Sequence, residues 1–155
     1  MRKTLLVLLI LVVLITGCVN QMDKSDNSSG QAKLPKLEGV WTVTLNQSGG
    51  LLGLSRNLIV TSSEEAILFD QKTMSYLPGA LKKDQVAKFS NEYEKVAITN
   101  VTKKNECADC FQYDLLIEVG KTKLNLTYND LDAGQNGLGA LTQYMVSLMD
   151  EAARK

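Results

Sequence analysis

The stretch from residue 40 to residue 62 constrains the fold of this chain more than any other. In its first half, the apolar residues Trp41, Val43 and Leu45 alternate with polar residues. Alternation of this kind predicts a strand with one buried face. Residues 54–62 carry a second run in which apolar residues return on one face. Because only a short turn separates the two runs, the sequence predicts a β-hairpin here.

The connecting turn is rich in both glycine and leucine. Its residues are Ser48, Gly49, Gly50, Leu51, Leu52, Gly53 and Leu54. Glycine permits backbone angles that other residues resist. A turn needs only to reverse the chain, and polar residues do so more safely than leucines. The central leucines, Leu51 and Leu52, therefore either fold back onto the core or contact a partner.

Two later segments have the three- and four-residue spacing of amphipathic helices. The first, residues 81–96, follows a break in the chain at Pro78 and Gly79. The second, residues 138–149, follows a loop over residues 130–139 that is rich in Asp, Asn and Gly. The sequence therefore predicts two helices, one before and one after residues 111–128.

Residues 111–119 show the clearest alternation in the chain. Across a tight turn at Gly120 and Lys121, residues 124–128 alternate in the same way and predict a second hairpin. Residues 66–70 add a short strand after the first hairpin. Short connections favour antiparallel pairing. The sequence thus predicts an α+β domain, with a four- to five-stranded antiparallel sheet of two hairpins and two helices, at least one packed on one face.

The N-terminal residues have the composition of an export signal. Arg2 and Lys3 precede an unbroken apolar run over residues 5–15, and Cys18 follows shortly after. This run is too short to span a bilayer, so it predicts a signal peptide. Residues 15–18, Ile-Thr-Gly-Cys, resemble the lipobox of prokaryotic lipoproteins. The resemblance implies cleavage before Cys18 and a lipid on Cys18 that anchors the exported protein to a membrane, facing the cell exterior or the periplasm. The alternative is an ordinary signal peptide that happens to end at a cysteine.

The rest of the chain divides at Pro35. Residues 18–36 are small and polar, so they bury too little apolar surface to offset the entropy cost of ordering. They predict a flexible, lipidated tether. Residues 37–155 are sufficient for one independently folding domain. The predicted organisation is a signal peptide at residues 1–17, a tether at 18–36 and a single domain at 37–155.

The composition argues against several classes of function. The 17 basic and 17 acidic residues cancel, and aromatic residues make up 6% of the chain, which argues against nucleic-acid binding. The absence of histidine removes the commonest general base and zinc ligand. The carboxylates are scattered, and Ser48 has no histidine to activate it. The sequence therefore predicts no enzyme, no cofactor and no metal site.

Cys107 and Cys110 form a Cys-x-x-Cys motif. A thioredoxin-type motif opens a helix, whose N-terminus stabilises the thiolate, whereas this one leads into a predicted strand. Two cysteines without histidine are also too few for a structural zinc site. In an exported protein, the pair predicts a disulfide.

Two short motifs resemble a known family. Residues 43–54 are similar to the strand and Ser-Gly-Gly-x-x-Gly turn that open emfourin-type proteins, and residues 108–113 are similar to the start of a later strand in that family. The C-terminal helix is similar as well. The family includes small inhibitors of thermolysin-like zinc proteases and many prokaryotic lipoproteins. The resemblance covers residues 40–150 and implies a four-stranded antiparallel sheet with a packed helix. The chain departs from the family in its cysteine pair and in having no proline before the last helix.

The resemblance implies a cell-surface lipoprotein whose non-catalytic domain inhibits a thermolysin-like zinc protease through the turn at residues 48–54. Such proteases favour bulky apolar residues, which Leu51 and Leu52 supply. The alternative is a surface-binding or envelope-structural lipoprotein module with no protease target. A third possibility comes from Gly39 and Trp41, which are similar to the Gly-x-Trp start of lipocalin-like ligand carriers, but such barrels need about eight strands.

Overall fold

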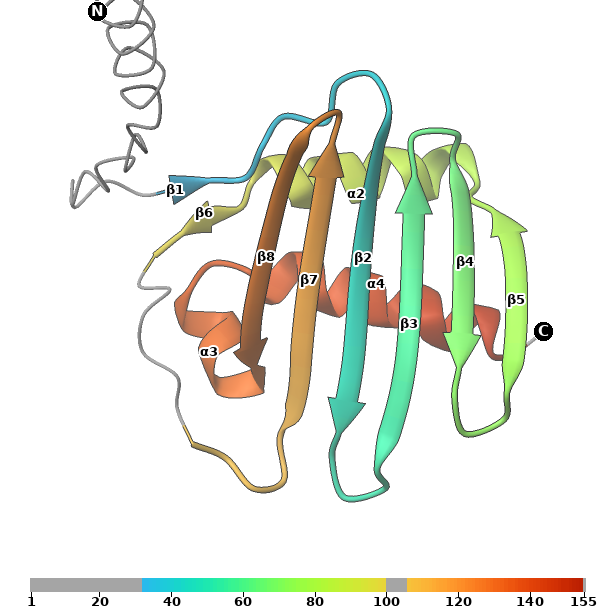
Figure 1. Ribbon diagram of the computed structural model, residues 1–155, viewed down its shortest axis with the longest axis vertical. Helices are drawn as coiled ribbons and strands as arrows, with labels where there is room; N and C mark the ends of the chain where they lie inside the picture. Colours follow the sequence, from blue (N-terminus) through green and yellow to red (C-terminus); the bar gives the residue numbers. More distant parts are fainter. Residues whose placement is uncertain (1–31, 100–105, 155) are drawn as a thin grey trace, which may run out of the picture. The chain divides into compact units, whose positions relative to one another are not determined.

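The computed structural model describes residues 32–99 and 106–154. Their main element is a six-stranded antiparallel sheet with strand order β5-β4-β3-β2-β7-β8 (Figure 1). The strands are β2 (Trp41–Gly49), β3 (Leu54–Thr61), β4 (Glu65–Asp70), β5 (Ser75–Ala80), β7 (Phe111–Val119) and β8 (Thr122–Asn129). The chain therefore has the α+β fold that the sequence predicts, and the hairpin expected at residues 40–62 is formed by β2 and β3.

Three helices accompany the sheet in the described part of the chain: α2 (Lys83–Glu94), α3 (Asp130–Gln135) and α4 (Gly139–Ala152). Figure 1 shows α2 and α4 on the same face of the sheet. The sequence predicts these two helices to within three residues at each end. It predicts a loop where α3 forms, because a six-residue helix is too short to show an apolar stripe.

The helix-covered face of the sheet carries the core. β2 lies at the centre of the sheet, and its Val43 and Leu45 are 0% exposed. Their paired neighbours, Leu58 and Val60 on β3 and Leu115 and Ile117 on β7, are buried too. The helices cover them with Phe89, Tyr93, Leu141, Met145, Leu148 and Met149. Burial of each such side chain contributes roughly 1.5–3 kcal/mol, so this layer is the main source of stability.

The sheet has more strands than the four to five predicted. The strand missing from the prediction is β5, whose residues are exposed from Tyr76 to Ala80. Pro78 argues against a strand in sequence, yet β5 lies at the edge of the sheet, where a missing amide is tolerated. Because β5 and β8 are both edges, the six-stranded sheet is open and differs from a lipocalin-like barrel.

A second, two-stranded sheet forms from β1 (Ala32–Lys33) and β6 (Ala97–Ile98), which pair antiparallel. Leu34 follows β1 and is only 9% exposed. The hydroxyl of Tyr93 donates a hydrogen bond of 2.7 Å to the carbonyl oxygen of Pro35. Leu34 and Pro35, which lie within the predicted tether, thus contact the domain.

Candidate functional site

The turn between β2 and β3 projects its two leucines into solvent. Leu51 is 87% exposed and Leu52 is 77% exposed. Of the two alternatives that the sequence leaves open, folding back onto the core is therefore wrong. Ser48 pairs with Ser55, and Gly49 pairs with Leu54, so the two strands continue up to the base of the turn. The leucines stand at the tip of a fully paired hairpin.

The backbone of the turn requires its glycines. Gly49, Gly50 and Gly53 have φ angles of 92°, 67° and 59°, in the left-handed region that favours glycine. The amide of Gly53 donates to the carbonyl oxygen of Gly50 over 3.1 Å, which closes the turn. Gly50 must be glycine for a second reason, because a Cβ there would lie 2.5 Å from Cε1 of the Phe111 ring. This conformation of the turn therefore depends on its glycines.

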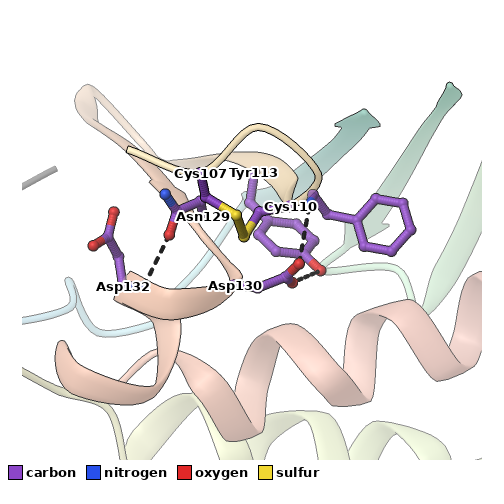
Figure 2. Close-up of a disulfide and its surroundings, with 7 residues drawn as sticks. Cys107, Cys110, Tyr113, Asn129, Asp130 and Asp132 are labelled. Carbon is purple, nitrogen blue, oxygen red and sulfur yellow. Dashed lines mark hydrogen bonds between the residues drawn. A yellow bond between two sulfur atoms is a disulfide. The ribbon is translucent and has the colours of Figure 1, made fainter. Parts of the chain in front are cut away.

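A disulfide-bonded loop supports the turn from the side of β7. Cys107 and Cys110 form the disulfide that the sequence predicts, with their Cα atoms 5.5 Å apart (Figure 2). The amide of Gly50 donates to the carbonyl oxygen of Cys110 over 3.3 Å. A Cβ on Gly49 would lie 3.0 Å from that same oxygen. The loop and the turn are thus in direct contact.

Asp130, the first residue of α3, fixes the start of β7. Its Oδ2 accepts a hydrogen bond of 2.8 Å from the amide of Phe111, and its Oδ1 accepts one of 2.7 Å from the hydroxyl of Tyr113. Figure 2 shows the Asp130 carboxylate turned toward the hydroxyl of Tyr113. Burial raises the pKa of Tyr113 above its ordinary value, and Asp130 raises this pKa further because a phenolate beside a carboxylate is disfavoured. The neutral phenol is therefore the stable donor.

Beneath the turn, on the helix-covered face, Arg56 joins the hairpin to α4. Its guanidinium donates to Oε1 of Gln47 over 2.6 and 3.2 Å and to Oδ1 of Asp150 over 2.6 Å. Gln47 is 2% exposed, and the Arg56 side chain is 9% exposed. A buried charge is stable only when it is paired and hydrogen-bonded, and both conditions are met. The base of the hairpin is consequently tied to the helix layer.

The structure brings together two features that the sequence analysis treats separately, the turn and the cysteine pair. It also adds Phe111 and Asp130 to the site, whereas the sequence predicts Phe111 only as a strand residue and Asp130 as a solvated surface acid. No local pattern marks Asp130, which is far in sequence from the amide that it binds. Only the pairing of β7 with β8 brings these groups together.

The described part of the chain holds no group of three or more His, Cys, Asp or Glu side chains placed to bind a metal ion. No helix within residues 32–99 and 106–154 is long and apolar enough to cross a membrane. Cys18 and the predicted signal peptide at residues 1–17 lie outside the described residues.

The chain matches none of the models of known protein families against which it was scanned, and none of the curated proteins searched.

Proposed function

We propose that this domain is a non-catalytic inhibitor that presents the β2–β3 turn to a thermolysin-like zinc protease. The observation that supports the proposal most directly is the exposure of Leu51 and Leu52, at 87% and 77%, on the tip of a paired hairpin. Two adjacent leucines in water contribute nothing to the core. A few side chains at the centre of an interface supply most of its binding energy, and a leucine contributes there when its apolar surface leaves water.

The supports of the turn favour inhibition over cleavage. A protease binds its substrates in an extended conformation, whereas this turn is closed by its own hydrogen bond and fastened to the loop at Cys110. A turn that is already ordered loses little entropy on binding. Residues 48–54 carry no side chain that ligates zinc, so the proposed mode is steric blockade of the cleft.

A titration of the soluble domain against a thermolysin-like, a serine and a cysteine protease tests this proposal. Only the zinc enzyme should be inhibited, and the domain should stay uncut in mass spectra. Leu51→Asp and Leu52→Asp should each weaken inhibition by at least about tenfold, because a charge would enter an apolar site. Val40→Asp is the matched control, since Val40 is 81% exposed at the other end of β2.

The opposite results would count against inhibition. If no protease is slowed, the alternative of a surface-binding or envelope-structural module gains support. If Val40→Asp weakens inhibition as much as Leu51→Asp does, the contact surface lies elsewhere on the domain.

We also propose that the protein is exported and anchored to a membrane through lipid on Cys18, which rests on the lipobox-like residues 15–18. Metabolic labelling with a radioactive fatty acid should mark the wild-type protein. Cys18→Ser should abolish the label and either release the protein or leave its precursor unprocessed. Normal cleavage together with unchanged membrane retention of Cys18→Ser would contradict the anchor.

A further inference from the structure

A second turn, between β4 and β5, also exposes an apolar side chain. Met74 is 74% exposed, so it contributes little to the core. Its backbone has a φ angle of 52°, a left-handed conformation in which a long side chain is disfavoured relative to glycine or asparagine. The fold therefore gains little from methionine at this position, where the side chain is free to contact another molecule.

This turn lies at the same end of the sheet as the β2–β3 turn (Figure 1). Hydrogen bonds join the two turns at their bases. The hydroxyl of Ser55 donates to Oε1 of Gln71 over 2.7 Å, and the amide of Gln71 donates to the carbonyl oxygen of Ser55 over 3.0 Å. These hydrogen bonds hold Leu51 and Leu52 on one turn close to a set distance from Met74 on the other.

The β4–β5 turn has hydrogen bonds of its own. Oδ1 of Asp70 accepts hydrogen bonds from the amides of Lys72 and Thr73, over 2.9 and 3.3 Å. A side chain that binds the backbone two and three residues ahead fixes the shape of a turn. Met74 thus lies in a turn that is held by its own hydrogen bonds, and the next residue but one, Tyr76, is 61% exposed on the same hairpin.

We propose that Met74 forms a second apolar contact with the partner that binds Leu51 and Leu52. This inference rests on the proposed function, and it specifies the partner further. The protease must carry an apolar patch beside its cleft, at the distance that separates the β2–β3 turn from the β4–β5 turn. The two contacts together would select such a protease over one whose cleft is bordered by polar residues.

The test uses the substitution Met74→Gly, which removes the side chain and suits the left-handed backbone. The variant should unfold at the same temperature as the wild type or higher, and it should inhibit the thermolysin-like protease about tenfold less well. Glu64→Gly is the matched control. Glu64 is also exposed, with a φ angle of 63°, but it lies in the β3–β4 turn at the opposite end of the sheet. This control should keep full inhibition.

The outcomes separate this inference from the proposed function. If Leu51→Asp weakens inhibition and Met74→Gly leaves it unchanged, the second contact is refuted while inhibition through the first turn stands. If Glu64→Gly weakens inhibition as much as Met74→Gly, the effect is not specific to this surface, and the inference is again refuted. If the wild-type domain does not inhibit the zinc protease at all, both proposals are refuted.

Discussion

The ring of Phe111 covers Gly50 so closely that a Cβ at Gly50 would lie 2.5 Å from the ring. Phe111 is the first residue of β7, and its amide is bound by Asp130. The shape of the candidate binding turn is thus determined by a strand that follows it by some sixty residues in the sequence, as the pairing of Gly49 with Phe111 shows.

Gly50→Ala should destabilise the domain more than Gly53→Ala does. Both glycines have positive φ angles, so alanine costs about 1–2 kcal/mol at either position. Nothing lies within 4 Å of a Cβ on Gly53, whereas at Gly50 the Phe111 ring must swing away, which adds about 1 kcal/mol. Urea denaturation measures the difference. In a Phe111→Ala background, Gly50→Ala and Gly53→Ala should lower the free energy of unfolding by the same amount. Equal losses in the wild-type background would contradict the contact between Gly50 and Phe111.

Replacing Cys107 and Cys110 together by serine should lower the free energy of unfolding by about 2 kcal/mol, because the disulfide closes a short loop in the unfolded chain. A thiol assay on the unfolded, unreduced domain should find both residues blocked. Stoichiometric zinc in the purified domain, lost together with folding on chelation, would contradict a structural disulfide.

Arg56→Met should lower the free energy of unfolding by about 1–3 kcal/mol, because it removes both guanidinium hydrogen bonds to the buried Gln47. The matched control is Lys123→Met, which breaks a 3.2 Å ion pair with Glu118 on side chains that are 64% and 45% exposed. An exposed pair of this kind contributes about 0–1 kcal/mol. Equal losses in the two variants, measured by urea denaturation, would mean that the buried network adds no stability beyond a surface pair.

The domain should lose stability in alkaline solution. Burial raises the pKa values of Tyr93, Tyr113 and Tyr128 above their ordinary value near 10. Above about pH 10 the unfolded chain releases these protons while the folded chain keeps them, so stability falls as the pH rises. Below that pH the tyrosines add no pH dependence. Urea denaturation from pH 8 to pH 11 measures the slope, which Tyr128→Phe should reduce; an identical slope in this variant would contradict the shift at Tyr128.

The sequence predicts the buried elements well and the exposed ones poorly. β2 and β7 alternate clearly because one face of each packs against helices, and α2 and α4 carry stripes for the same reason. β5 leaves no such pattern because it is an exposed edge strand. The candidate site follows the same rule in part. Its glycines and leucines stand out locally, whereas the roles of Phe111 and Asp130 depend on strand register, which single-sequence patterns do not give.

The position of β2 at the centre of the sheet has a consequence for how fast the protein folds. From β2 to β5, each strand pairs with the next one in the sequence, and β7 pairs with β8 in the same way. The pairing of β2 with β7, by contrast, must close a loop that contains β3, β4, β5 and α2. Closing long loops is slow because entropy is lost before the new contacts form. We therefore expect the pairing of β2 with β7 to limit the refolding rate. In stopped-flow experiments Ile117→Val, in the middle of that pairing, should slow refolding more than it speeds unfolding.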